Sequence, residues 1–375
     1  MTIRVNKTIL YLIDTTGPGG AETVFIQLAD KIRAKGWKPI VVIRGKGWVY
    51  DELCRRNISP IILDAKGSFN FRFLWDLIKI IKKESVGLIH SHLLGSNVYA
   101  SLVGLLTGCP VVATYHGMVD IAPNERFKNI KQWAMRWGIA RYVSVSHSLA
   151  DSIREKKLLS MEKTSVIYNG VDASVYGLDS GTGIRDKLGL GSEAVLVGSL
   201  GNVRPAKAYD ILIEAASQVV KNCPEVHFVI AGDNKNSLMS QLDRRLNELN
   251  LGDVVHFIGF QSNSAAMLSQ MDVFLLSSTS EGFSISTIEA MATGLPVLVT
   301  RCGGPEEIIT HAQNGWMVDK DNAQALAEGL IFLLGHERER QKISENALSH
   351  VRNFFSLDKM VSEYESLYKG VVAKG

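Results

Sequence analysis

The chain has 375 residues, of which 46% are hydrophobic and 21% are charged. This composition excludes a disordered chain, and the length exceeds what one hydrophobic core usually supports, so we expect two domains. No apolar run approaches the roughly 20 residues that cross a bilayer, and the N-terminus lacks a signal-peptide pattern. The four cysteines are scattered without disulfide or metal-ligand spacing. We therefore expect a cytoplasmic protein without a bound metal.

The net charge of +3 is unevenly distributed. Residues 1–185 hold 25 Lys and Arg against 15 Asp and Glu, a net of +10, whereas the remaining residues hold 16 against 23, a net of −7. The basic half is therefore expected to meet an anionic partner. No Lys/Arg run or nucleic-acid motif is present, so we expect no nucleic-acid partner. A phosphorylated acceptor or the inner face of an anionic membrane, contacted peripherally, is favoured.

Short apolar runs alternate with amphipathic segments along the whole chain. In the first half these runs predict strands at Thr8–Ile13, Pro39–Ile43, Gly87–His90, Val111–Thr114, Tyr142–Val145 and Ser165–Ile167. In the second half they predict strands at Ala194–Ser199, His227–Ala231, Val254–Ile258, Val273–Leu276 and Pro296–Val299. Helical spacing predicts helices that include Glu22–Lys35, Phe73–Glu84, Asp210–Val220, Leu238–Leu249 and Leu357–Val371.

Strands that alternate with helices are typical of parallel sheets covered on both faces. The two series predict an α/β protein with two doubly wound, Rossmann-like parallel-sheet domains. Glycine and polar residues between Asp172 and Leu190 break the periodicity, so we expect domains at 1–180 and 181–356. Ligands bind beyond the carboxyl ends of such strands, which predicts a cleft between two facing domains.

The first predicted strand leads into a glycine-rich turn and then a helix. Gly19 and Gly20 would allow a ligand to approach the backbone at the helix N-terminus, or they form only a tight turn. The spacing is a weak match to a dinucleotide-binding fingerprint. Arg44 ends the next strand where an NAD-binding protein needs an acidic residue, although NADP binding would tolerate it. A dinucleotide site is therefore disfavoured.

His116 stands at the carboxyl end of a predicted strand and is followed by Gly117. At this position it can hydrogen-bond a sugar hydroxyl as a neutral group. His90 and His92 also end a strand, but no acidic residue shows metal-ligand spacing with them, so they are interpreted as structural.

The segment Asn124–Arg141 interleaves basic residues with aromatic residues. At helical spacing one apolar stripe is formed, and such a stripe most often faces the core. The stripe consists of Phe127, Ile130, Ala134 and Trp137. The alternative is that the basic, Trp-rich remainder contacts an anionic membrane.

Two cations, Arg204 and Lys207, follow the first strand of the second domain, with Asn202 before them. They are either an exposed loop pair or the groups that neutralise a diphosphate as it leaves.

The most informative segment follows the strand Val273–Leu276. A polar turn with Glu281 and Gly282 leads to a helix that stops at Gly294. The amides of Phe283, Ser284 and Ile285 would then form an anion site at the helix N-terminus, unless Ser280 or Ser284 caps it. Glu289 follows about two helical turns after Glu281. Carboxylates beside an anion site suit hydroxyl groups, so this pattern indicates a sugar nucleotide.

In this order the segments resemble the retaining glycosyltransferases of family 4, which have the GT-B fold. The strongest element is Glu281 to Glu289, which looks like the family's E-x7-E motif. The supporting matches are Gly19 to Glu22, His116–Gly117, Tyr168 to Asp172, Lys207, Ala231 to Asp233, and Gly303–Gly304 with Glu307.

The resemblance implies transfer of a hexosyl unit from a nucleoside diphosphate sugar, held mainly by the second domain, to a carbohydrate or lipid-linked acceptor, held mainly by the first. Glu289 would bind the ribose, Glu281 and His116 the donor sugar, and Lys207 the diphosphate, with Gly19 and Gly20 approaching it. The amides after Glu281 would lie near the sugar or the diphosphate. The family is generally metal-independent, so the resemblance implies no metal ion, and we expect no cofactor beside the nucleoside diphosphate sugar as co-substrate. The C-terminal helix, 357–375, would pack on the first domain.

Two positions depart from the family pattern. Asn202 stands where many members have Arg, so Arg204 is the expected substitute, and Ala208 stands where Gly is common. The rival functions are a nucleotide-sugar 2-epimerase of the same fold and a non-catalytic sugar-nucleotide binding protein. A glycoside hydrolase is disfavoured, because helical spacing would place the two carboxylates about 12 Å apart along the axis.

Overall fold

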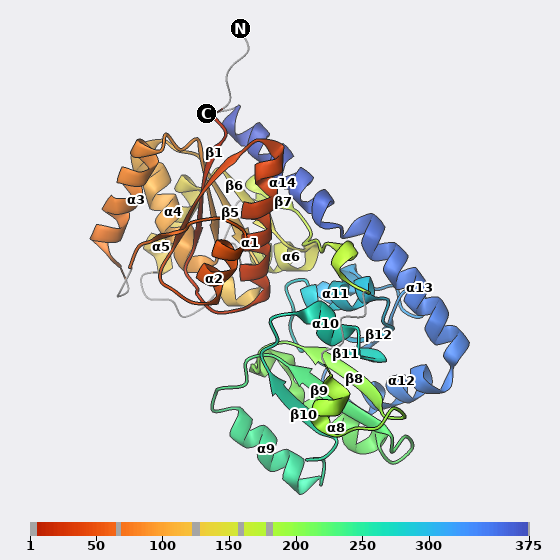
Figure 1. Cartoon of the computed structure of the whole chain (residues 1–375). Coiled ribbons are helices and arrows are strands. Elements are labelled where there is room, and N and C mark those ends of the chain that lie inside the picture. Colours follow the sequence, from red (N-terminus) through yellow and green to blue (C-terminus); the bar gives the residue numbers. More distant parts are fainter. Residues whose placement is uncertain (1–5, 65–68, 122–127, 157–160, 178–182, 374–375) are drawn as a thin grey trace. The chain divides into compact units, whose positions relative to one another are not determined.

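The computed structural model describes residues 6–64, 69–121, 128–156, 161–177 and 183–373. The chain divides into two compact units, which are coloured along the sequence in Figure 1. The N-terminal unit comprises Met1–Asn169 and Asp358–Gly375, and the C-terminal unit comprises Gly170–Leu357. The expected boundary at residue 180 lies outside the described residues. The chain passes between the units earlier, after Asn169, and returns after Leu357.

Seven parallel strands form the sheet of the N-terminal unit, in the order β3-β2-β1-β4-β5-β6-β7. They are β1 (Thr8–Ile13), β2 (Lys38–Ile43), β3 (Ile61–Ile62), β4 (Leu88–His92), β5 (Val111–Tyr115), β6 (Arg141–Ser144) and β7 (Thr164–Val166). The helices between them are α1 (Gly20–Lys31), α2 (Trp48–Arg55), α3 (Phe71–Lys83), α4 (Leu94–Thr107), α5 (Lys128–Gly138) and α6 (His147–Glu155). Short 3-10 segments are η1 (Ile32–Lys35), η2 (Met118–Ile121) and η3 (Met161–Lys163).

Six parallel strands form the sheet of the C-terminal unit, in the order β10-β9-β8-β11-β12-β13. They are β8 (Val195–Leu200), β9 (Val226–Ala231), β10 (Val255–Gly259), β11 (Val273–Leu276), β12 (Val297–Arg301) and β13 (Trp316–Asp319). The helices are α7 (Ile184–Leu188), α8 (Tyr209–Val219), α9 (Met239–Glu248), α10 (Ser264–Leu268), α11 (Ile285–Thr293), α12 (Ala323–Gly335) and α13 (Glu337–Phe354). The 3-10 segments are η4 (Ala173–Val175), η5 (Pro205–Lys207) and η6 (Gly304–Glu307).

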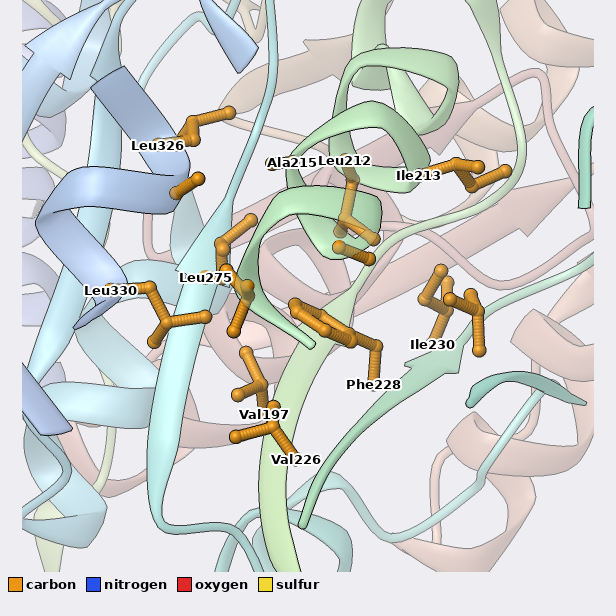
Figure 2. Packing of buried hydrophobic residues seen from close by; sticks show 14 of the residues in the cluster. Val197, Leu212, Ile213, Ala215, Val226, Phe228, Ile230, Leu275, Leu326 and Leu330 are labelled. Carbon is orange, nitrogen blue, oxygen red and sulfur yellow. The ribbon is translucent and has the colours of Figure 1, made fainter. Parts of the chain in front are cut away.

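The core of the C-terminal unit lies between this sheet and its helices. Phe228 of β9 and Val197 of β8 pack with Leu212 of α8 and Leu330 of α12 (Figure 2). Every one of these side chains is almost fully buried. The apolar strands of both units are covered in the same way, so the predicted pair of doubly wound parallel sheets is confirmed.

Two strands were missed by the sequence prediction, and both lie at a sheet edge. β3 has only two residues, and β13 is only partly buried. A short or half-exposed edge strand lacks the continuous apolar run that identifies a buried parallel strand.

The last helix, α14 (Leu357–Val372), belongs to the N-terminal unit although it follows the C-terminal unit in the chain. Its Tyr368 hydroxyl lies 2.8 Å from His90 Nδ1 and 3.1 Å from the Tyr11 hydroxyl, and its Tyr364 hydroxyl lies 3.2 Å from Thr114 Oγ1. All of these side chains are fully buried. A satisfied polar network of this kind fixes the position of the helix on the sheet.

The prediction that one apolar stripe of α5 faces the core is wrong. Ala134 and its neighbour Met135 are buried, but Ile130 and Trp137 are 64% and 63% exposed. Phe127 lies outside the described residues. The helix is buried through Ala134 and Met135 instead, and at Gly138 it lies close to the backbone of Ser101 in the neighbouring helix α4. Among the described residues, no helix has both the length and the apolar content needed to cross a membrane.

Candidate functional site

The centre of the candidate site in the C-terminal unit is an ion pair. Lys207, at the end of η5, lies with Nζ 2.7 Å from Oε1 of Glu281, in the loop after β11. The loops meet because β8 and β11 are adjacent parallel strands, whose carboxyl ends share one edge of the sheet. The two side chains are only 19% and 16% exposed. This is a partly desolvated pair, with more mutual attraction than a fully solvated surface pair.

Neighbouring groups hold both partners. Ser278 Oγ donates to Glu281 Oε1 at 2.7 Å, and Ser277 Oγ donates to the backbone oxygen of Lys207 at 2.8 Å. Burial alone would lower the pKa of Lys207, but the Glu281 carboxylate, with Tyr209, more than offsets it, so this pKa is raised. Lys207 is therefore a fixed positive charge at neutral pH.

Helix α11 begins at Ile285, beside this pair. Its N-cap residue, Ser284, has φ of +81°, and no side chain caps the first turn. The Ser284 hydroxyl lies 2.7 Å from the Thr287 hydroxyl instead. A left-handed non-glycine residue is strained, and such strain is typical of functional sites. The alternative that Ser280 or Ser284 caps this helix finds no such hydrogen bond among the described residues, so the first amides of the helix can bind an anion.

The loop before η6 closely supports the start of this helix. A β-carbon on Gly304 would overlap the backbone of Phe283, so only glycine fits there. Glu281 and Gly303 form a backbone bridge, and Gly304 N donates to Glu281 O at 3.1 Å. Glu306 Oε2 accepts hydrogen bonds from the Cys302 and Gly303 amides at 3.1 and 2.9 Å. These contacts fix the loop that contains Gly282 and Phe283.

Glu289 lies on α11 and is partly buried. Its Oε1 accepts a hydrogen bond from the Tyr176 hydroxyl at 2.8 Å and from Ser264 Oγ at 3.3 Å. Burial raises the pKa of Glu289, while these two donors lower it in part. No described residue donates to Oε2. One carboxylate oxygen is thus held in place while the other remains available to a hydroxyl pair.

The predicted spacing of Glu281 and Glu289 needs correction. Eight residues separate them in the sequence, but α11 begins only at Ile285 and Glu281 lies in the loop before it. The two carboxylates are therefore not two positions on one helix. The 12 Å helical estimate does not apply.

Asn202 and Arg204 occupy the loop after β8 with different surroundings. Asn202 Oδ1 accepts the Asp233 amide at 2.9 Å, which ties the loops after β8 and β9 together. Arg204 is exposed, and within the described ranges it has no ion-pair partner. Arg204 is therefore available to a diphosphate, whereas Asn202 has a structural contact. Ala208 adopts φ of +46°, the left-handed conformation for which glycine is the usual residue.

Gly19 and Gly20 lie where predicted, at the N-terminus of α1 in the N-terminal unit. A β-carbon on Gly19 would overlap the Glu22 carboxylate, which also accepts from Thr15 Oγ1 at 2.5 Å. The space created by this glycine is thus occupied by Glu22 rather than left open.

His116 follows β5 and stacks on His92, with ring centroids 5.1 Å apart. His116 Nε2 and His92 Nδ1 are 2.8 Å apart, so one ring donates to the other. Burial lowers the pKa of His116 to about 3, so both rings are neutral at physiological pH. His92 was interpreted as structural. Its contact with His116 couples the tautomers of the two neutral rings, because one nitrogen of this pair must donate the proton and the other must accept it.

Two carboxylates at this edge were not recognised in the sequence. Asp120 Oδ2 accepts the His116 and Gly117 amides at 2.7 and 3.3 Å, and burial raises its pKa to about 6. Asp14, directly after β1, has a raised pKa because of burial, which the charge of Arg44 partly offsets. The signal in the sequence that could have identified them was their position directly after strands.

The described residues contain no group of three or more His, Cys, Asp or Glu placed to hold a metal ion.

The structure thus brings together Lys207, Glu281 and the start of α11, and places Arg204 and Asn202 in the same loop system of the C-terminal unit. The predicted residues of the N-terminal unit gather at the carboxyl edge of its own sheet. Sequence reasoning missed the residues that orient the predicted ones: Ser278, Tyr176, Ser264, His92 and Asp120.

Two family descriptions match the chain. Residues 182–350 match Glycosyl transferases group 1, and residues 18–175 match Glycosyltransferase Family 4. Together they cover most of both units.

Two curated relatives match over most of their length. N-acetyl-alpha-D-glucosaminyl L-malate synthase of Bacillus anthracis is 27% identical over 305 residues, covering 79% of this chain and 78% of the relative. UDP-Gal:alpha-D-GlcNAc-diphosphoundecaprenol alpha-1,3-galactosyltransferase of Escherichia coli is 26% identical over 330 residues, covering 85% and 82%.

Solved structures share the fold. Anabaena Alr3699/HepE, crystallised with UDP and glucose, aligns with a TM-score of 0.88 and 21% identity over 97% of this chain and all of that one. A glycosyltransferase from Rickettsia africae aligns with a TM-score of 0.86 and 24% identity over 99% and 100%. The pair of Rossmann-like domains is thus the GT-B fold. The chain belongs to the group 1 glycosyltransferases, with a family 4 N-terminal region, and is a hexosyltransferase.

Proposed function

We propose that the protein transfers a hexosyl unit from a nucleoside diphosphate sugar to an acceptor hydroxyl, with retention at the anomeric carbon and without a metal ion. The product would belong to a cell-surface polysaccharide or glycolipid. The observation that carries this proposal is the Lys207–Glu281 pair beside the uncapped start of α11. A fixed cation and free helix amides suit a diphosphate, and a carboxylate suits sugar hydroxyls.

In the proposed reaction the bond from the anomeric carbon to the diphosphate oxygen breaks. The acceptor oxygen bonds to the same face of that carbon, and its proton passes to the leaving diphosphate. Lys207, Arg204 and the amides of Ser284 and Ile285 would stabilise the negative charge that develops on the diphosphate. This electrostatic role needs no protein nucleophile.

The other site residues are assigned to binding. Glu289 would accept hydrogen bonds from the ribose hydroxyls through Oε2, since Oε1 already accepts hydrogen bonds from Tyr176 and Ser264. Glu281 would bind the donor sugar with the Gly282–Phe283 backbone, and Asn202 would hold the loop. The neutral His116 would hydrogen-bond a sugar hydroxyl, and the backbone at Gly19 and Gly20 would approach the diphosphate.

The names of similar proteins suggest what to test first. HepE was crystallised with UDP-glucose as well as with UDP, and the Escherichia coli relative is named for UDP-Gal and a diphosphoundecaprenol-linked acceptor. We therefore propose a UDP-sugar donor and a lipid-linked or phosphorylated acceptor. The excess of positive charge in residues 1–185 supports an anionic acceptor.

The test is a donor screen followed by turnover. Thermal unfolding is measured with UDP-, GDP- and ADP-sugars, and the stabilising donor is then incubated with lipid-linked acceptors, with and without EDTA. We expect one nucleotide class to raise Tm and the α-linked product to form equally with EDTA. Product without acceptor would identify an epimerase, and binding without turnover on any acceptor would identify a non-catalytic protein. No stabilisation by any donor would contradict the proposal.

A further inference from the structure

Large apolar side chains gather on the outer side of three neighbouring helices of the N-terminal unit. They are Phe71 and Trp75 of α3, Leu106 of α4, and Ile130, Trp133 and Trp137 of α5. Each is between 57% and 78% exposed. We call these six residues the α3–α5 face. Scattered single apolar residues are normal on a protein surface, but a cluster of this size marks an interaction site.

The three helices form one continuous layer. Helix α4 packs against both α3 and α5, and Figure 1 shows the three side by side. Tyr99 of α4 contacts Phe73 of α3, with ring centroids 4.7 Å apart. On the other side, a β-carbon on Gly138 would overlap the backbone of Ser101, so α5 lies unusually close to α4. The exposed residues therefore belong to a single surface.

The inward sides of these helices are already used for folding. Helix α3 buries Phe73, Leu77 and Ile81, and α5 buries Ala134 and Met135. On α3, Phe71 and Trp75 lie one turn apart on the side away from the buried residues, whereas on α5 Ile130, Trp133 and Trp137 form an exposed stripe beside Ala134 and Met135. The exposed residues of the α3–α5 face therefore form an additional apolar surface and do not contribute to the core.

The charge of the same layer is strongly positive. Helices α3, α4 and α5 together have seven Lys and Arg residues and one acidic residue. The acidic residue, Asp76, is within 4 Å of Arg72 and Lys79. Helix α5 has no acidic residue, and α4 has no charged residue at all. The Lys79 ammonium lies 5.9 Å from the Trp75 ring centroid, so a cation and an aromatic ring meet within the face itself.

We propose that the α3–α5 face binds the surface of an anionic lipid bilayer. Exposed Trp, Phe and Leu among Lys and Arg match the acyl–headgroup boundary, where indole rings insert and basic groups meet lipid phosphates. A protein partner is less suitable, because Lys is depleted from the centres of protein interfaces. The proposal concerns binding alone, so it stands or falls separately from the proposed sugar transfer.

The test is flotation of the full-length protein with vesicles, which requires no substrate. Vesicles of phosphatidylcholine alone are compared with an equal mixture of phosphatidylcholine and phosphatidylglycerol. We expect at least about tenfold stronger binding to the anionic vesicles, weakened by salt. In the double variant Trp133→Ser/Trp137→Ser, the affinity for anionic vesicles should fall by about tenfold or more. In Lys128→Gln/Arg136→Gln, this affinity should fall by about fivefold for each basic side chain removed.

Matched substitutions in the C-terminal unit serve as controls. Phe260→Ser removes another exposed aromatic residue, and Lys342→Gln removes another exposed lysine. Both controls should bind vesicles like the wild type. Thermal unfolding of every variant verifies its fold, which surface substitutions should leave intact.

Three outcomes would overturn the proposal. The first is no binding to anionic vesicles, and the second is equal loss of binding in the control and α3–α5 variants. The third is wild-type self-association that the Trp133→Ser/Trp137→Ser variant abolishes while vesicle binding remains unchanged. That result would assign the face to a second copy of the chain.

Discussion

The Lys207 ammonium and the Glu281 carboxylate lie 2.7 Å apart although 74 residues separate them in the sequence. Each neutralises the other inside a partly desolvated loop system. A diphosphate at the start of α11 would compete with Glu281 for the same ammonium. The pair thus keeps a cation in place, ready for a substrate anion, without leaving a buried charge unpaired beforehand.

Replacing Lys207 should reduce turnover more than donor binding. In Lys207→Ala we expect kcat to fall by about 100-fold or more, because a preorganised positive charge at the leaving group is lost. Steady-state kinetics with the donor found by the screen measure this. Lys235→Ala, which removes an exposed lysine of the same unit, is the control. Wild-type kcat in Lys207→Ala would refute the assignment.

Replacing Glu289 should instead weaken donor binding. We expect Glu289→Gln to raise the donor KM or Kd by about tenfold or more, because hydrogen bonds to a charged group are lost. Tyr176→Phe should have a smaller effect, about fivefold, because Ser264 still donates to the carboxylate. Isothermal titration with the free nucleotide and with its sugar measures both. If Glu289 binds the ribose, the two ligands should lose similar affinity. A loss confined to the nucleotide sugar would move Glu289 to the sugar.

The C-terminal unit should be sensitive to a single added methyl group where its first and last residues meet. A β-carbon on Gly170 would lie 2.5 Å from Ser356 O, next to the Val171 N to Phe355 O hydrogen bond of 2.9 Å. We expect Gly170→Ala to lower the free energy of unfolding by about 1–3 kcal/mol through overpacking. Denaturant unfolding of this variant is compared with that of Gly191→Ala, whose new methyl would meet no atom within 4 Å. Equal stability of the two variants would argue against the close contact.

Acidification should destabilise the sheet of the N-terminal unit. Burial holds the pKa values of His90 and His92 well below the usual value, so these rings stay neutral where unfolded histidine, with a pKa of about 6.5, binds a proton. The unfolded state then binds more protons, and stability falls as pH falls. From pH 7 to pH 5.5 we expect a loss of about 1 kcal/mol for each of the two rings. Asp120, with its pKa raised to about 6, takes up a proton in the folded state and offsets part of this loss.

Hydrogen exchange of the β4 and β5 amides, corrected for the intrinsic exchange rate, measures this change locally. Histidine ring resonances in NMR supply the control, since His90 and His92 should show no titration near the pH at which unfolded histidine binds its proton. An opening free energy that is constant or rises on acidification would contradict the prediction.

Much of the fold could be predicted because parallel strands buried on both faces leave continuous apolar runs. β1 and β11 have the predicted bounds, and α11 ends before Gly294 as predicted. The edge strands β3 and β13 could not be found in this way, since a short or partly exposed strand lacks such a run. Helix α5 misled the prediction because apolar spacing does not reveal which side of a helix faces the core.

The sequence alone determined how buried strands and helices follow one another along the chain. It also determined which chemical groups stand at the strand ends: Lys207 after β8, Glu281 after β11 and His116 after β5. Those features are local, so spacing and residue type reveal them. Only the tertiary structure decided that Lys207 meets Glu281, that Tyr176 holds Glu289 and that His92 contacts His116. It also decided that the Trp residues of α5 face outward. These contacts join residues far apart in the sequence. They depend on the order of the strands within each sheet and on helix packing, which local sequence patterns do not reveal.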